Sequence, residues 1–224
     1  MTNKTTVIIK TIGRKSVKAA IESAKREGFT THVISDGIWF PPDQSEPDLQ
    51  RAYGGTLAGA DSYTKLGRRW GYYGGMAANV GAALAETEFV TFLDDDDEFA
   101  PGAGEAIRRN LEEKPDVDVW IGGVRFNTAI NVNNTATGEV LLESTDLSMN
   151  GELGIVPGNV CMPTYRTSIF SVCPFRDNIP KEDVNLTDFY HIKTCELSGY
   201  KVDWFGQVIY LVRPVVGGVN GAGE

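Results

Sequence analysis

The order of apolar and polar positions predicts an α/β chain in which strands and helices take turns. The β-branched run Thr6–Lys10 is typical of a strand, and apolar residues at helical spacing between Ser16 and Phe29 predict a helix after it. Gly28 marks the end of this helix, and Thr31–Ser35 predicts a second short strand. A strand, a helix and a second strand in this order predict a parallel pair.

The same order continues through the middle of the chain. The small-residue segment Met76–Ala85 predicts a helix opened by Gly74 and Gly75, and Glu88–Leu93 is an apolar run of the kind that is buried on both faces of a sheet. We expect a further helix from Pro101 to about residue 114, followed by a strand over Val117–Phe126.

Two stretches break the pattern. Residues 38–73 contain Pro and Gly pairs with scattered aromatics, which predicts a long loop region with room for one helix. Residues 127–160 are polar and rich in Asn and Gly, with one apolar pair at Leu141–Leu142, which predicts a hairpin or a flap. After them we expect a helix over 186–197 and two strands, over 200–205 and 208–212.

Length and composition describe an ordinary globular protein. The 224 residues are 42% hydrophobic and 23% charged, enough to bury roughly 70% of the surface around one core. No run approaches the ~20 apolar residues that span a bilayer, and the first residues lack the pattern of a signal peptide. The expectation is a cytoplasmic protein without a transmembrane segment.

Charge and cysteine usage limit the partners, the metal sites and the compartment that we expect. The chain has 21 Lys and Arg against 30 Asp and Glu, a net charge of −9, which disfavours nucleic acid as a main partner. Its cysteines, Cys161, Cys173 and Cys195, form no C-x-x-C pair, so neither a disulfide framework nor a zinc knuckle is indicated. We expect small buried thiols in a reducing compartment.

The sharpest feature is a run of five carboxylates, Asp94 to Glu98, directly after an apolar strand. Two like charges 4 Å apart cost about 1 kcal/mol in bulk water and about 4 kcal/mol at an effective dielectric constant of 20, so the cluster needs a cation or protonation. Because side chains alternate along an extended chain, we expect Asp94 and Asp96 to point one way and Asp95 and Asp97 the other. We favour Mg²⁺ or Mn²⁺ with substrate phosphate oxygens over a solvated acidic loop that caps the next helix.

Three other phosphate-handling classes lack their motifs. The chain contains no G-x-x-x-x-G-K-[ST] loop, which excludes a P-loop nucleotide site. The first strand ends in Lys10–Gly13 rather than in the D-x-D of an aspartyl phosphatase. No G-x-G-x-x-G follows that strand, so a dinucleotide fold has no fingerprint.

Four segments in order resemble the family 2 glycosyltransferases of the GT-A fold. They are Val7–Arg14, Val33–Gly37, Gly75 through Pro101, and Lys181–Asp183. The central one, a small-residue helix that runs into a strand and then L-D-x-D-D-x-x-x-P, is the most specific.

The resemblance implies a fold and a division of the chain. The fold is a three-layer α/β sandwich with a mostly parallel central sheet and helices on both faces. Residues 1–224 would form one domain, with a nucleotide-sugar-binding half at 1–100, an acceptor and catalytic half at 101–212, and a mobile tail at 213–224.

The resemblance also implies roles for the donor site. Thr11, with Gly13 and Arg14 in the same turn, and Asp36 would hold the nucleotide. Asp94 and Asp95 would contact the nucleotide, and Asp96, together with Asp94, would bind the Mn²⁺ or Mg²⁺.

The helix before the acidic run departs from the family pattern. The family often has Ala-Arg-Asn where this chain has Ala77-Ala78-Asn79, so Asn79 is kept as a binding residue but a basic phosphate contact is missing. The basic residues that offer a replacement are Arg14, Arg68, Arg69 and Arg213.

The pair Glu182–Asp183 resembles the family's E-D pair, of which the second carboxylate serves as catalytic base. Sugar transfer with inversion needs one carboxylate within about 3 Å of the acceptor hydroxyl to take its proton. Asp183 is therefore the expected base, with Glu182 beside it; a solvated helix start is the alternative for this pair.

Other side chains carry weaker signals. His191 fits a hydrogen-bonded, partly buried histidine better than a ligand. Aromatic residues able to stack on a sugar or base, or simply to fill the core, are Trp70, Tyr72, Tyr73 and Trp204.

The resulting hypothesis is an inverting, metal-dependent glycosyltransferase that uses a nucleotide-sugar, with UDP-sugar favoured. The acceptor is open among a small molecule, a glycan and a protein. The alternatives are a nucleotidyltransferase that makes nucleotide-sugars and a catalytically silent nucleotide-sugar-binding module.

Overall fold

The computed structural model describes residues 4–14, 16–37, 57, 59–71, 74–126, 140–142, 162–176 and 187–212. Its strands are β1 (Thr5–Thr11), β2 (Thr30–Ser35), β3 (Ser62–Lys65), β4 (Phe89–Asp94), β5 (Glu98–Phe99), β6 (Val119–Phe126), β7 (Val140–Leu142), β8 (Met162–Arg166) and β9 (Val202–Val212). Its helices are α1 (Val17–Arg26), α3 (Gly75–Leu84), α4 (Ala103–Glu113), the 3₁₀ helix η2 (Thr167–Ser171) and α5 (Thr187–Leu197).

Within these residues, nine strands form one sheet in the order β3-β2-β1-β4-β8-β6-β9-β5, with β7 paired to β6. Strands β3, β2, β1 and β4 are parallel neighbours, and β6 and β9 run in the same direction as these four. Strands β5, β7 and β8 run the other way. The mostly parallel α/β sheet is thus confirmed.

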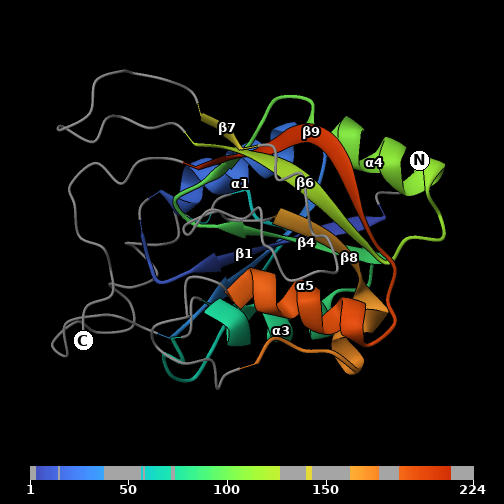
Figure 1. The fold of residues 1–224 in the computed structure, drawn as a ribbon. Coiled ribbons are helices and arrows are strands. Elements are labelled where there is room, and N and C mark those ends of the chain that lie inside the picture. Colours follow the sequence, from blue (N-terminus) through green and yellow to red (C-terminus); the bar gives the residue numbers. More distant parts are fainter. Residues whose placement is uncertain are drawn as a thin grey trace, which may run out of the picture.

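Helices cover both faces of the sheet. Helices α1 and α4 lie on one face, and α3 and α5 lie on the other (Figure 1). The helices of the first half, α1 and α3, both pack on β1 and β2. The molecule therefore has the three layers that the resemblance implied.

Several elements differ from the sequence prediction. The edge strand β3 lies in the stretch predicted as loop, and β5 and β8 were not predicted. The two late strands are one strand, β9, whose register on β6 shifts around Gly123. A bulge of this kind inserts extra residues without ending the pairing, which explains why the pattern looked like two strands. Pro101 lies in the turn before α4, not in its first turn.

The small residues of α3 let it pack closely against β1. A Cβ at Gly81 would lie 2.3 Å from Cγ2 of Ile8, closer than any real contact. Ala77, Ala78 and Ala82 are buried on the same helix. A larger residue at position 81 would push the helix away from the strand that carries Lys10 and Thr11.

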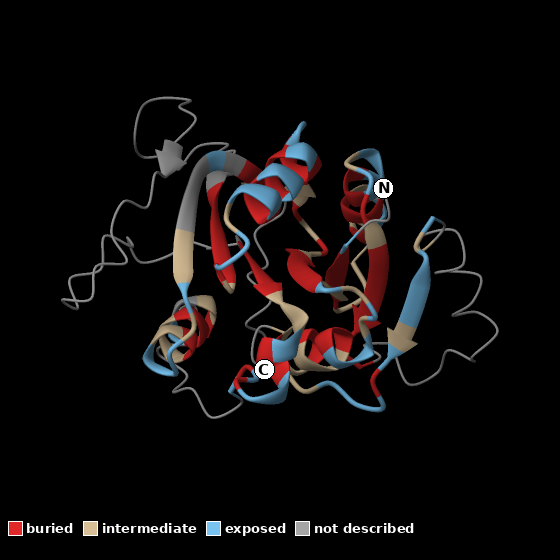
Figure 2. Cartoon of the chain, turned by 90° about the vertical axis from the view of Figure 1, so that its right-hand side faces the viewer, coloured by how far each residue is buried: buried red, intermediate tan, exposed pale blue. Residues whose placement is uncertain are grey.

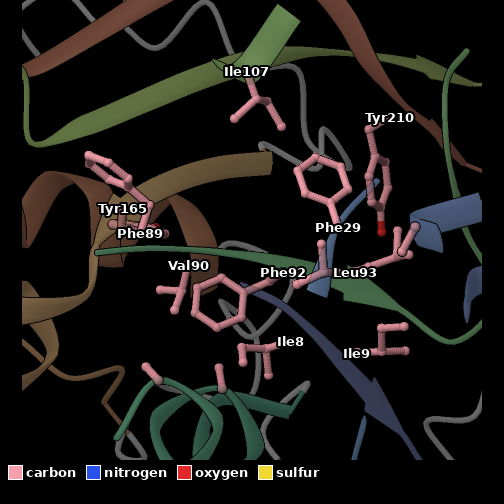
Figure 3. Close-up of a cluster of buried hydrophobic side chains, with 14 of the residues drawn as sticks. Ile8, Ile9, Phe29, Phe89, Val90, Phe92, Leu93, Ile107, Tyr165 and Tyr210 are labelled. Carbon is pink, nitrogen blue, oxygen red and sulfur yellow. The ribbon is translucent and has the colours of Figure 1, made fainter. Parts of the chain in front are cut away.

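The core lies along the central strands, where buried residues are concentrated (Figure 2). Side chains of β4 alternate between the two layers: Phe92 points to the side of Ile8, and Leu93 to the side of Phe29 and Tyr210 (Figure 3). Ile8, Leu93 and Tyr210 are fully buried. Both faces of β4 are therefore buried up to the acidic run, as its continuous hydrophobic pattern predicted.

His191 of α5 lies in an aromatic cluster under the sheet. Its ring stacks on Phe175 with a centroid distance of 3.9 Å and an interplanar angle of 19°. Nε2 donates to the carbonyl oxygen of Cys173 at 2.7 Å, so Nδ1 accepts from the hydroxyl of Tyr165 at 3.1 Å. The expected hydrogen-bonded, buried histidine is confirmed, and Cys173 and Cys195 are buried thiols.

In the described part of the chain, no helix combines the length and the apolar character needed to cross a bilayer.

The cluster predicts a pH-dependent stability. Burial lowers the pKa of His191 to about 4, from an ordinary value of 6.5. The unfolded chain therefore binds more protons between these values, so the stabilising contribution of His191 is complete above pH 6.5 and falls by up to about 3 kcal/mol as the pH drops toward 4. Urea unfolding of wild type and His191→Phe at pH 7.0 and 4.5 checks this.

The unfolding free energy of the wild type relative to that of His191→Phe should be lower at pH 4.5 than at pH 7.0. The same difference at both pH values would contradict the account of His191.

Candidate active site

The site forms where the direction of the sheet topology reverses. From β1 the chain proceeds to β2 and β3 on one side, then returns to β4 on the other side of β1. Ligands of open α/β sheets bind at such a switch point, outside the carboxyl ends of the strands. Here these ends carry Thr11 on β1 and Asp94 on β4, and Asp95 and Asp96 follow.

Asp95 is the fixed carboxylate of the site. It is buried, and its Oδ2 accepts from the hydroxyl of Thr11 at 2.6 Å and from the backbone N–H of Ile12 at 3.1 Å. The Thr11 hydroxyl oxygen accepts in turn from the N–H of Gly13 at 2.9 Å. The turn after β1 and the acidic run after β4 are thereby joined.

Arg14 bridges two carboxylates with one nitrogen. Its Nη1 lies 2.9 Å from Oδ1 of Asp95 and 2.7 Å from Oδ2 of Asp96. The expected alternation of side chains past Asp94 is wrong, because β4 ends there and the N–H of Asp97 donates back to the carbonyl of Asp94 at 3.2 Å. The turn brings the side-chain carboxylates of Asp95 and Asp96 to the same nitrogen of Arg14.

A largely buried lysine neutralises Asp94 from the neighbouring strand. Lys10 is paired with Asp94 in the β1–β4 register, and its Nζ lies 2.9 Å from Oδ1 of that residue. Burial acts to lower the pKa of Lys10, but the charges of Asp94 and Asp188 outweigh it and raise the pKa. A Cβ at Gly74 would lie 2.9 Å from Cδ of Lys10, so the glycine leaves space for the lysine side chain.

Asp188, in the first turn of α5, was missed by the sequence analysis. Burial raises its pKa to about 6, with the charge of Lys10 acting to lower it and that of Asp94 to raise it. These interactions put Asp188 near the Lys10–Asp94 pair. The available signal was Lys10, a lysine inside an apolar strand that requires buried carboxylates around it.

The far end of the acidic run is held by a buried tyrosine. The hydroxyl of Tyr210 on β9 donates to Oδ2 of Asp97 and accepts from the N–H of Asp94 at 3.2 Å. In Figure 3 the Tyr210 ring lies above the end of β4 near Leu93. Burial, together with the charge of Asp97, raises the pKa of Tyr210, so it remains a hydrogen-bond donor.

Asp36 fastens a neighbouring loop. Its Oδ1 accepts from the N–H of Trp70 at 2.9 Å and its Oδ2 from that of Gly71 at 3.0 Å, while its own N–H donates to the carbonyl of Thr11 at 2.8 Å. The guanidinium of Arg68 lies 3.8 Å from the centre of the Trp70 ring. Asp36 is thus beside Thr11 and holds the segment that carries Trp70.

Asn79 joins α3 to the segment after η2. Its Nδ2 donates to the carbonyl of Phe175 at 2.9 Å, and its Oδ1 accepts from the N–H of Phe175 at 2.8 Å. The residue before it, Ala78, is buried and offers no basic side chain at this position of the helix.

Part of the expected site lies outside the described residues. This applies to Glu182 and Asp183, to Arg213 and the tail 213–224, and to Tyr72 and Tyr73. Their roles stay predictions.

The donor atoms suit a hard divalent cation. Asp96 is partly buried, and burial, with the charges of Asp95 and Asp94, raises its pKa although Arg14 acts to lower it. One guanidinium therefore leaves the negative charge incompletely balanced. Mg²⁺ and Mn²⁺ prefer carboxylate oxygen, so the residues present fit such an ion, with Asp96 as its ligand and Asp94, already paired with Lys10, as the second candidate.

Fold and site together define an α/β protein with an acidic, oxygen-donor site at the switch point of its sheet. Residues 6–172 match the family model described as Glycosyl transferase family 2, and the chain belongs to this family. No curated protein matches the chain by sequence.

Solved glycosyltransferase structures share the fold. S. aureus TarS 1–349 superposes with a TM-score of 0.63 at 16% identity, covering 94% of this chain and 60% of that one. The same protein in complex with UDP-GlcNAc gives 0.63 at 15% identity over 99% and 61% of the two chains. The mannosyltransferase PcManGT from Pyrobaculum calidifontis, in complex with GDP-Man and Mn²⁺, gives 0.58 at 13% identity over 96% and 58%. This chain spans about 60% of the length of these structures.

The hydrogen bonds that Asp36 accepts from Trp70 and Gly71 predict a loss of stability when its carboxylate is replaced. In Asp36→Asn an amide NH₂ replaces one acceptor oxygen and faces a backbone N–H of Trp70 or Gly71. We expect the free energy of unfolding to fall by about 1–3 kcal/mol, the cost of a buried hydrogen-bonding group left without its partner. Chemical denaturation measures the change, and Glu112→Gln, at an exposed position of α4, is the control.

If Asp36→Asn is as stable as the control, the carboxylate does not hold this loop.

Proposed function

We propose that the chain is a metal-dependent glycosyltransferase that moves a sugar, with inversion, from a nucleotide-sugar to an acceptor hydroxyl. The observation that carries the proposal is the linkage of Thr11, Arg14, Asp95 and Asp96 at the switch point of the sheet. Membership of glycosyl transferase family 2 supports the reaction class.

The donor side rests on the residues around Asp95. Thr11 and Asp36 would bind the nucleoside, with UDP-sugar as the favoured donor because TarS has been solved with UDP and UDP-GlcNAc. When bound at Asp96, a divalent cation would supply positive charge against the departing diphosphate. Asp95 would keep this part of the site rigid, since it is buried and bound by Thr11 and Ile12.

The acceptor side needs one carboxylate as general base. The base takes the proton of the acceptor hydroxyl while the hydroxyl oxygen attacks the anomeric carbon and the bond to the diphosphate breaks. The resemblance assigns this role to Asp183, beside Glu182. A second candidate among the described residues is Asp188 in the first turn of α5, whose pKa burial raises to about 6, with the charge of Lys10 acting to lower it and that of Asp94 to raise it.

Metal dependence is the first prediction for this function. Without a cation, the carboxylates around Asp96 and a diphosphate repel each other. Calorimetry with UDP and Mn²⁺ should detect binding to the wild-type protein, with little heat in EDTA and little in Asp96→Ala. Asp36→Ala should weaken UDP binding but keep the metal requirement.

Undiminished UDP affinity in EDTA would overturn the metal assignment. Equal effects of Asp96→Ala and Asp36→Ala on every nucleotide would contradict the division of roles.

The second prediction concerns the base, whose role exists only in the transition state. Asp188→Asn should lower kcat by about 10²–10⁴-fold and leave the Kd for UDP nearly unchanged. Glu196→Gln, on the same helix where it pairs with Lys193, is the control and should keep wild-type kcat. The assay is product formation with a panel of nucleotide-sugars and acceptors.

Asp183→Asn and Glu182→Gln are measured in parallel. A normal rate in Asp188→Asn together with an inactive Asp183→Asn would return the base to Asp183, and an inactive Glu182→Gln alone would move it to Glu182. Conversion of a nucleoside triphosphate and a sugar 1-phosphate into a nucleotide-sugar and diphosphate, assayed separately, would favour a nucleotidyltransferase, and nucleotide binding without turnover in either assay would favour the silent module.

A further inference from the structure

Arg14 contacts two of the carboxylates that follow β4, those of Asp95 and Asp96. A single nitrogen, Nη1, lies 2.9 Å from Asp95 and 2.7 Å from Asp96. This is not the two-pronged pairing that guanidinium groups form with one carboxylate. The arrangement resembles a cation shared between two acids, which is the position that a metal ion would take.

The two carboxylates are held very differently. The Asp95 side chain is 4% exposed and is also bound by Thr11 and Ile12, whereas the Asp96 side chain is 23% exposed. Within the described part of the chain, Arg14 is the side-chain partner of Asp96. The contact with Asp95 is therefore the anchored end of the bridge, and the contact with Asp96 is the end that can open.

Arg14 itself is able to turn without a change of the fold. Its side chain is 35% exposed and extends from the turn between β1 and α1, where its carbonyl accepts from the N–H of Val17 at 3.3 Å. The backbone thus keeps its helix-opening contact while the long side chain changes rotamer.

Charge and distance decide the competition for Asp96. A divalent ion carries twice the charge of a guanidinium and approaches a carboxylate oxygen to about 2.1 Å. A diphosphate that arrives with the ion offers Arg14 new acceptor oxygens of the geometry that guanidinium groups bind best. The position of Ala78 on α3 provides no competing basic side chain.

We propose that Arg14 is an exchangeable internal cation: it neutralises Asp96 in the nucleotide-free protein and moves from Asp96 to the donor diphosphate when a divalent ion and a nucleoside diphosphate bind. Asp95 guides this movement because it keeps its contact with the guanidinium of Arg14. The inference rests on the proposed function for its ligand, a nucleoside diphosphate, but its first half concerns the metal ion alone.

The first experiment measures Mn²⁺ binding to the nucleotide-free protein by calorimetry. Arg14→Met should bind Mn²⁺ about tenfold more tightly than wild type, the size of one charge-assisted hydrogen bond. Arg14→Lys, which keeps the positive charge, should stay near wild type. Arg108→Met is the matched control. Arg108 lies on the surface of α4 and donates to the carbonyl oxygen of Glu27.

The gain should depend on Asp96. The double variant Asp96→Asn with Arg14→Met should lose the tighter Mn²⁺ binding. If Arg14→Met does not fold, as judged by thermal unfolding, Arg14→Gln takes its place because it keeps a hydrogen-bond donor. Unchanged or weaker Mn²⁺ affinity in the folded variant would overturn the competition.

The second experiment measures UDP affinity at saturating Mn²⁺. Arg14→Met should bind UDP about tenfold more weakly than wild type, so the substitution strengthens one ligand and weakens the other. Equal UDP affinity would overturn the transfer to the diphosphate. If the wild-type protein and Arg108→Met bind no UDP with Mn²⁺, the proposed function fails, while the nucleotide-free Mn²⁺ measurement still decides the competition.

Discussion

The neutralisation of a crowded set of carboxylates is the constraint on which the rest of the structure depends. Asp94 to Asp97 follow one another at the end of a buried strand, and each receives a different partner. Lys10 pairs with the first, Thr11 and Ile12 bind the second, Arg14 bridges the second and third, and Tyr210 donates to the fourth. These partners come from β1, the turn after it and β9, so the acidic run ties both halves of the sheet to one point.

The packing of the sheet supplies this arrangement with precision. Gly81 brings α3 against Ile8, and Gly74 leaves space for the side chain of Lys10 on the same face. Because Lys10 and Asp94 are register partners, the cation lies under the carboxylate without any loop to position it. On the opposite side of β1, Asp36 holds Trp70 and Gly71. The chemistry is thus built on strand ends and on loops fastened to them.

Sequence patterns predicted the features that depend on residues close together in the chain. The strand–helix alternation, the small-residue helix and the acidic run at the end of a buried strand all followed from the sequence. The strand β8 did not, because Pro163 within it lacks an N–H and argues against a central strand, yet it lies between β4 and β6. Asp188 was missed since its importance arises from Lys10, which is 178 positions away in the sequence. The turn at Asp94 depended on a hydrogen bond that no periodicity reveals.

The central claim is that the carboxyl ends of β1 and β4 bind a metal-associated nucleoside diphosphate. A crystal structure of the protein soaked with UDP and Mn²⁺ tests it most directly, because anomalous scattering locates the manganese independently of the nucleotide density. The account predicts one manganese peak coordinated by a carboxylate oxygen of Asp96, with the diphosphate on it and the uracil toward Asp36. Manganese and UDP bound elsewhere, with Arg14 still bridging Asp95 and Asp96, would contradict it.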